Sequence, residues 1–149
     1  MILFVSSQTL FPKIFLHFNR TIMDNINKEA IQQFLSVNEI SLRCTQAKLC
    51  IPIINRMYQK MVIGIKFSGI KVEDKLICDG HHRYFASLLA NYNIEQQPYI
   101  TTGATSTTEW KNVDFVEENW DTQAKIDILN EQDAKFNNIT VEQLIHLIN

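Results

Sequence analysis

Residues 76–90 constrain the fold of this chain more than any other segment. They read LICDGHHRYFASLLA, which is a short apolar run, then Asp-Gly, then two histidines and an arginine ahead of an amphipathic pattern. This order predicts a strand, a tight turn and a helix that has begun by His82. A helix N-terminus has free N–H groups and a positive dipole end, and both favour anions. We therefore expect the function of the chain to lie at this turn.

Length and composition bound the class of protein. A chain of 149 residues favours one domain, and 46% hydrophobic with 20% charged residues is typical of a soluble globular protein. The net charge of −2 argues against an extended basic surface, so nucleic acid is not an expected partner. The three cysteines lack CxxC or zinc-site spacing, and we expect reduced, buried thiols in a cytoplasmic protein.

Residues 1–22 differ from the rest of the chain. The first five residues are apolar, but no basic residue precedes Lys13, no clear cleavage site follows, and the run is too short to span a bilayer. The sequence after Met23 looks more like a natural beginning. We expect a mis-assigned start or a loosely attached segment over 1–22, with a signal peptide as the weaker alternative. A single domain without membrane association is expected over 23–149.

Further elements are predicted from hydrophobic periodicity and from capping residues. Two strands joined by a short turn are expected at 70–72 and 76–78, and single strands at 40–44 and 98–101. The other expected elements are a helix over 28–35 capped by Asn25 or Asn27, a helix from Pro52 to before Gly64, a helix from 82 to about Asn91, a polar loop over 101–108, a helix capped by Asp121 and running to about Lys135, and a last helix with a capping box of Thr140 and Gln143. These elements predict an α/β (α+β) fold in which helices surround a small mixed sheet.

Each polar residue of the predicted turn has a chemical role to offer. Asp79 can cap the helix, and Gly80 permits a positive φ or the close approach of a ligand. Arg83 offers a planar fork that suits phosphate or carboxylate. His81 and His82 can donate to a phosphate oxygen or transfer a proton near neutral pH. Together these side chains indicate an anion site.

A purely structural role for the same residues is the more common outcome at a helix start. In that case Asp79 only caps, one histidine packs beneath the sheet and Arg83 pairs with a surface carboxylate. A metal site of Asp79, His81 and His82 is a lesser alternative, because neighbouring histidines rarely converge on one ion. An open pocket on which both histidines and Arg83 converge would favour ligand chemistry, whereas a filled and paired site would favour an interaction module.

Residues 79–86, DGHHRYFA, resemble the signature box of the ParB/sulfiredoxin-like superfamily. In that superfamily a Gly-x-x-Arg-x-x-Ala pattern, here Gly80, Arg83 and Ala86, opens the helix that grips nucleotide phosphates. The preceding hairpin and upstream helix follow the order seen in the superfamily, so the resemblance covers about residues 36–100. It implies a small mixed sheet with surrounding helices, and nucleotide contacts from Gly80, His82 and Arg83.

The Asp-Gly-x-His-Arg form of the box resembles most the free-serine-kinase-like branch of the superfamily. Sulfiredoxin activity is not expected, because His81 stands where those enzymes have their nucleophilic cysteine. A partition protein is not expected either, because the chain is acidic and no downstream helix-turn-helix region is visible. Gln46 stands where the kinase-like branch has a glutamate base, and we expect it to contact the nucleotide. Glu39, Glu73 and His81 are then the candidate bases.

We therefore expect a nucleotide- or phosphate-binding domain, with phosphotransfer or NTP hydrolysis as a further activity. The expected cofactor is Mg²⁺ with ATP or CTP, the ion being held by Asp79, and the candidate catalytic residues are Asp79, His81, His82 and Glu39. Arg56 and Lys60 share a face of the predicted helix after Pro52; they are either surface charges or flank the phosphate site.

Two alternatives from other classes stay open. The first is a catalytically silent interaction module, such as an immunity protein or antitoxin, whose acidic surface would suit a basic protein partner. The second is a ParB-like nuclease, which needs clustered metal-binding carboxylates and a basic substrate track. Neither feature is visible in the sequence.

Overall fold

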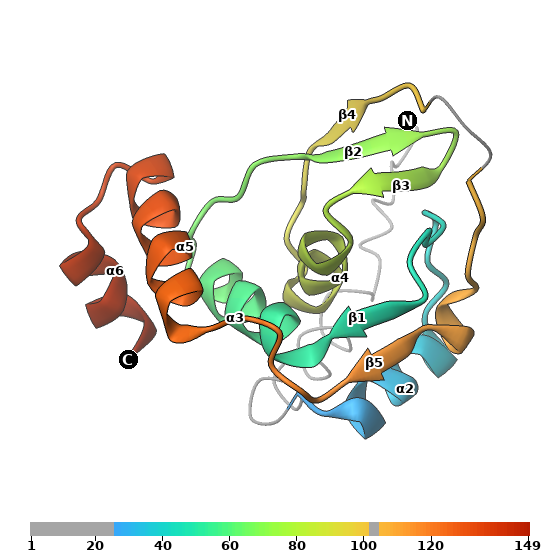
Figure 1. Ribbon diagram of the computed structural model, residues 1–149, viewed down its shortest axis with the longest axis horizontal. Helices are drawn as coiled ribbons and strands as arrows, with labels where there is room; N and C mark the ends of the chain where they lie inside the picture. The colour runs from blue at the N-terminus through green and yellow to red at the C-terminus, as the bar shows by residue number, and fades with distance from the viewer. Residues whose placement is uncertain (1–25, 102–104) are drawn as a thin grey trace, which may run out of the picture.

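The computed structural model describes residues 26–101 and 105–149, which have a mixed α+β architecture (Figure 1). No helix in these two ranges is both long and apolar enough to span a membrane. The described elements are, in chain order, α2 (Lys28–Val37), β1 (Lys48–Cys50), α3 (Ile51–Val62), β2 (Ile70–Glu73), β3 (Leu76–Asp79), α4 (His81–Ala90), β4 (Gln96–Pro98), the 3-10 helix η1 (Trp110–Asn112), β5 (Asp114–Val116), α5 (Gln123–Phe136) and α6 (Val141–Ile148).

Two small sheets lie on either side of α4 (Figure 1). The first has the order β3-β2-β4, with β2 antiparallel to β3 and parallel to β4. Its hairpin turn consists of Asp74 and Lys75, both at positive φ, as a two-residue hairpin turn of type I′ requires. The second sheet pairs β1 with β5 in parallel, with Leu49 opposite Phe115. Helix α4 is therefore the central element of the molecule.

Helix α4 buries two of its faces. Phe85 belongs to the main apolar cluster, which also contains side chains from α2, α3, β1 and β5. Tyr84 packs on the three-stranded sheet together with Ile70 and Ile77. Because apolar contacts fix α4 on both sides, the turn before it has a defined position between the two sheets.

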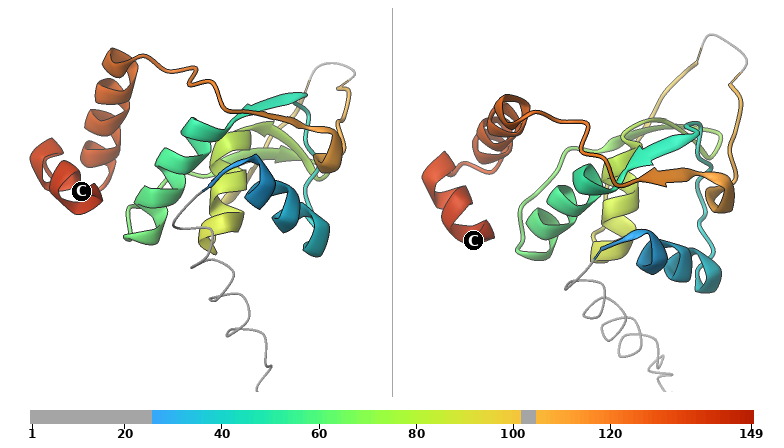
Figure 2. Two further views of the ribbon diagram at one scale, coloured as in Figure 1. Left: turned by 90° about the horizontal axis from the view of Figure 1, so that it is seen from below. Right: turned by 60° about the horizontal axis from the view of Figure 1, so that its bottom comes forward.

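Helices α5 and α6 form a hairpin at one end of the molecule, and an extended segment joins it to β5 (Figure 2). A third, smaller apolar cluster of Ile65, Ala134 and Leu144 attaches this hairpin to the segment after α3. The capping box predicted for Thr140 and Gln143 is confirmed, since each side chain accepts from the other's backbone N–H. We refer below to α5 and α6 as the C-terminal hairpin and to the remaining elements as the body.

Most of the local signals in the body are confirmed. Asn27 caps α2 by accepting from the Ala30 N–H, Pro52 lies in the first turn of α3, and α3 ends shortly before Gly64. The β2–β3 hairpin and the strand–turn–helix passage into α4 are also as predicted. Cys44 and Cys50 are buried free thiols, as expected, whereas Cys78 is only partly buried.

The single strands were predicted in the wrong places. Arg43 and Cys44 form only isolated bridges, and the strand begins later, at Lys48, where β5 provides a parallel partner. β4 precedes the predicted 98–101 because β2 pairs with Gln96–Pro98. In both cases a distant partner strand decides which residues pair.

Thr122 caps α5, so the prediction of Asp121 as cap is wrong. The Thr122 side chain accepts from the Lys125 N–H, while Asp121 is paired with Arg56 instead. The expectations for residues 1–22 and for Asn25 lie outside the described residues, as does the middle of the predicted polar loop, residues 102–104.

Candidate functional site

Gly80 is the N-cap of α4 and leaves this helix start without a side-chain cap. Its φ is +95°, and a Cβ here would lie 2.7 Å from Ile70 Cγ2 and 2.9 Å from Arg83 Nη2, so only glycine fits. The prediction that Asp79 caps the helix is wrong. Asp79 ends β3, and its side chain is 64% exposed.

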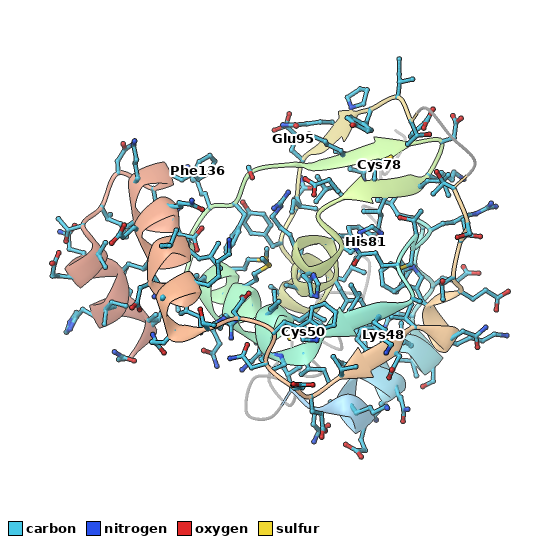
Figure 3. The ribbon with its side chains drawn as sticks, in the orientation of Figure 1. Lys48, Cys50, Cys78, His81, Glu95 and Phe136 are labelled. Atoms are coloured by element: carbon cyan, nitrogen blue, oxygen red, sulfur yellow. The ribbon has the colours of Figure 1, made fainter. Side chains whose placement is uncertain are left out.

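His81 is buried and acts as a structural acceptor between α4 and the segment before β1 (Figure 3). The Thr45 backbone N–H donates to its Nε2 over 3.1 Å, and the Thr45 hydroxyl, which donates to the Ile77 carbonyl, lies 2.9 Å from the same nitrogen. Burial lowers the pKa of His81 to about 4, against the opposing effect of Asp79. The imidazole is therefore neutral at physiological pH.

His82 is partly buried and also accepts a backbone hydrogen bond. Its Nε2 accepts from the backbone N–H of Cys50 over 2.9 Å, and its ring meets Trp120 edge to face with centroids 5.6 Å apart. Burial, and secondarily the neighbouring His81, lower the pKa of His82 to about 4, although Asp121 acts in the other direction. His82 therefore joins the starts of α3 and α4 as a neutral group.

Arg83 is directed differently from the two histidines. Its Nη2 donates to the Gly69 carbonyl over 3.0 Å, and the nearest carboxylate oxygen, Asp79 Oδ2, is 3.8 Å away. Its Nε is buried and has no hydrogen-bond partner. A buried donor without an acceptor is costly, which makes this guanidinium a group that an added acceptor would stabilise.

Arg83 lines a cavity of about 230 Å³ between α3, the segment after α3 and α5. We call this the α3–α5 cavity. Four basic side chains and two carboxylates line it, namely Arg56, Lys60, Lys66 and Arg83 with Asp121 and Asp133. Its positive charges therefore outnumber its negative charges by two.

Two of the four basic residues are neutralised by the carboxylates. Arg56 Nη2 lies 2.7 Å from Asp121 Oδ2, and Lys60 Nζ lies 2.6 Å from Asp133 Oδ2 and also donates to Asn130. The other two basic residues, Arg83 and Lys66, are not neutralised in this way. Lys66 has no carboxylate partner within 26–101 and 105–149, and the carboxylate nearest to Arg83 is mostly solvent-exposed.

The remaining predicted site residues do not line the cavity. Gln46 and Glu39 are exposed, in the segment before β1 and just after α2. Glu73 accepts from the backbone N–H and the hydroxyl of Thr101, and these hydrogen bonds lower the pKa of its carboxyl group. The predicted residues thus fall into three groups. The two histidines accept backbone hydrogen bonds, the carboxylates and Gln46 lie outside the cavity, and Arg83 lines it.

The donor set does not fit a resident Mg²⁺. In the part of the chain that the structure describes, no three His, Cys, Asp or Glu side chains come together as ion ligands. Asp79 supplies a single carboxylate, and it faces Arg83. One carboxylate beside a cation is a poor site for a hard divalent ion.

Sequence reasoning found part of the cavity and missed the rest. The four-residue spacing of Arg56 and Lys60 predicted a shared helix face, and both residues line the cavity. Lys66 carried no signal, because it lies in an irregular segment. Asn130 and Asp133 were missed because α5 reads as an ordinary solvated helix until its position against α3 is known.

No family model, no curated protein and no solved structure matches this chain. The geometry of the α3–α5 cavity therefore provides the evidence about function.

Proposed function

We propose that the chain binds a phosphate-bearing small molecule, with the phosphate in the α3–α5 cavity. The observation that carries this proposal is Arg83, which lines the cavity and whose Nε is buried and has no hydrogen-bond partner. Lys66 adds a second cation without a carboxylate partner among the described residues. Arginine forms paired, charge-assisted hydrogen bonds to phosphate oxygens, and a lysine nearby adds a point charge.

The size of the cavity favours a phosphate tail rather than a whole enclosed ligand. Its 230 Å³ lies below the roughly 300–1,000 Å³ of pockets that enclose drug-sized ligands. The rest of the molecule would therefore extend into solvent. The resemblance of residues 79–86 to the ParB/sulfiredoxin-like box supports a nucleotide such as ATP or CTP, and the α+β architecture is compatible with that superfamily.

The proposal covers binding and not phosphotransfer or hydrolysis. His81 and His82 are neutral, and each accepts a hydrogen bond from a backbone N–H. Asp121 and Asp133 each form an ion pair with a basic side chain. An oriented, available base is what phosphoryl transfer to a nucleophile would need. The described lining of the cavity offers none.

Titration calorimetry with ATP, CTP and sodium tripolyphosphate, each with EDTA and with Mg²⁺, tests the proposal. We expect binding under both conditions, because Arg83 and Lys66 contact the phosphates directly. Arg83→Ala should weaken affinity by about 30-fold or more, on the scale of a truncated charge pair. Arg83→Lys should restore only part of it, because a point charge cannot replace the planar fork.

Lys111→Ala is the matched control. It removes one positive charge at an exposed position outside the cavity and should leave the affinity unchanged. If Arg83→Ala does not fold, Lys66→Ala at an exposed position tests the same site.

Failure of the folded parent protein to bind any of the three ligands at millimolar concentration would overturn the proposal. The interaction module then becomes the leading function. The filled and paired surroundings of His81 and His82 already favour that alternative over catalysis.

A further inference from the structure

We infer that Phe136 is a stacking platform for the planar base of a nucleotide whose phosphates lie in the α3–α5 cavity. This inference rests on the proposed function and narrows it, because it separates nucleotides from other phosphate-bearing molecules. In this account the preference for nucleotides comes from a residue of the C-terminal hairpin and not from the turn at Gly80.

Phe136 lies at the mouth of the cavity. It is the last residue of α5 and lines the cavity, yet 56% of its surface is exposed. Figure 3 shows Phe136 on the side of α5 that faces the segment between α3 and β2. An aromatic ring that belongs to a cavity wall and is also open to solvent presents a face on which a ligand ring can stack.

Asn137, the residue after Phe136, holds the end of α5 close to Lys66. Asn137 accepts from the Lys66 N–H over 2.7 Å, and its side-chain amide donates to the Lys66 carbonyl over 2.9 Å. These two hydrogen bonds hold the end of α5 against the segment that carries Lys66. A phosphate bound by Lys66 and Arg83 therefore lies in the same cavity whose mouth Phe136 forms.

The volume of the cavity requires the base to leave through that mouth. A space of about 230 Å³ that holds the phosphates has no room for a ribose and a base as well. The base then meets the exposed surface around the opening. Stacking on an aromatic side chain tolerates any base, because every base has a π-face.

No other aromatic residue in the described lining offers an exposed face. The remaining apolar residues of the wall are aliphatic apart from Phe67, which is partly buried against the apolar clusters. Trp120 is exposed but packs against His82 and does not line the cavity. Phe136 is therefore the residue that a base would meet.

The test compares ATP with tripolyphosphate, which has three linked phosphates without the ribose and the base. In calorimetry the parent protein should bind ATP more tightly than tripolyphosphate. Phe136→Ala should weaken ATP binding by about tenfold, which corresponds to about 1.4 kcal/mol, and should leave tripolyphosphate binding unchanged. Phe136→Trp should keep the preference for ATP. Ile128→Ala, exposed on α5 and outside the cavity, is the control and should bind both ligands as the parent does.

Two results would overturn the inference and leave the proposed function intact. In the first, the parent binds ATP and tripolyphosphate equally well. In the second, Phe136→Ala weakens both ligands to the same degree, which would mean that the ring shapes the cavity and does not contact a base. Absence of binding by both ligands would instead overturn the proposed function itself.

Discussion

The body and the C-terminal hairpin are stabilised in different ways. Phe85 of the body meets the rings of Phe34, Trp110 and Phe115 at centroid distances of 5.9, 5.5 and 5.0 Å, within a continuous apolar cluster. Among the described residues the hairpin shares a small apolar cluster with the body, and the Lys60–Asp133 ion pair and side-chain hydrogen bonds add to the attachment. The cavity lies where apolar packing gives way to these polar contacts, and the binding function is proposed at that boundary.

Three consecutive residues illustrate the same difference. His81 and His82 point into the body, where they accept hydrogen bonds from Thr45 and Cys50 as neutral groups. Arg83 points to the boundary with the hairpin and keeps an unpartnered donor. One short motif therefore contributes two residues to the stability of the body and one to the proposed site.

The largest expected effect concerns the body. Phe85→Ala should lower the free energy of unfolding by about 3–5 kcal/mol, because it leaves a cavity at the centre of the main cluster. Ile128→Ala on the exposed side of the hairpin should cost no more than about 0.5 kcal/mol. Urea unfolding followed by circular dichroism measures both. Equal costs would contradict the position of Phe85 at the centre of the main cluster.

Acid should destabilise the body through His81, which is buried, and His82, which is partly buried. The pKa of each is about 4 in the folded state and near 6.5 when exposed, so between these values the unfolded state binds more protons. The contribution of the two neutral histidines to the free energy of unfolding is therefore present above pH 6.5 and is lost as the pH drops towards 4. Between pH 7.5 and 5 we expect a loss of roughly 2–4 kcal/mol in the free energy of unfolding.

The double variant His81→Gln, His82→Gln serves as the control for this acid effect. Glutamine keeps an acceptor but does not titrate, so most of the pH dependence should disappear. A parent protein that is equally stable at pH 5 and 7.5 in urea unfolding would show that the folded state does not keep these two imidazoles neutral.

Loss of Lys60 should loosen the hairpin selectively. Lys60→Ala leaves Asp133 without its cation and Asn130 without its donor. We expect amides of α5 and α6 to lose about 1–3 kcal/mol of protection in native-state hydrogen exchange, while amides of β2 and α4 keep theirs. Lys125→Ala, on the exposed side of α5, should change neither. An equal loss of protection throughout the body would show that the two regions unfold as one.

Alanine variants at Gly64 and Gly80 distinguish the effect of backbone strain from the effect of displacing Arg83. Gly80 and Gly64 have nearly the same positive φ, +95° and +93°, but a Cβ at Gly64 meets nothing within 4 Å. Left-handed strain should cost both alanine variants about 1–2 kcal/mol. Gly80→Ala should cost more than Gly64→Ala, because its Cβ would also meet the buried Ile70 side chain at 2.7 Å. Only Gly80→Ala should also weaken tripolyphosphate binding in calorimetry, because its Cβ would push the Arg83 guanidinium aside. Equal binding by the two variants would contradict the position given to Arg83.

Elements with local signals could be predicted from the sequence. Pro52 and the Thr140 capping box are read within one turn of helix, and the alternation around Asp74 and Lys75 marks a hairpin whose strands are neighbours in the chain. The three-residue strands β1 and β5 gave no such signal. Their paired residues are 66 positions apart in the chain, and the strands are too short for alternation, so only the assembled core fixes their pairing.

The candidate site was predictable in its residue types but not in its arrangement. Arg83 was predicted as a phosphate ligand from its place in the motif, and the residues that line the cavity with it come from α3, the segment after α3 and α5. His81 is a structural acceptor because it contacts Thr45, 36 residues away in the chain, and no sequence pattern predicts that contact. Asp79 and Asp121 were assigned as caps because a cap and its neighbour look alike when the helix start is uncertain by one residue.

The Nε–H resonance of Arg83 in nitrogen-edited proton NMR tests the central claim most directly. This N–H is buried and has no acceptor in the free protein, and it belongs to the side chain that the account places on the phosphate. During titration with tripolyphosphate we predict a saturable shift of this resonance and of the Lys66 and Ser68 amides, while the Thr45 amide beside His81 stays in place. Shifts confined to Thr45 and its neighbours, with an unchanged Arg83 resonance, would contradict the account.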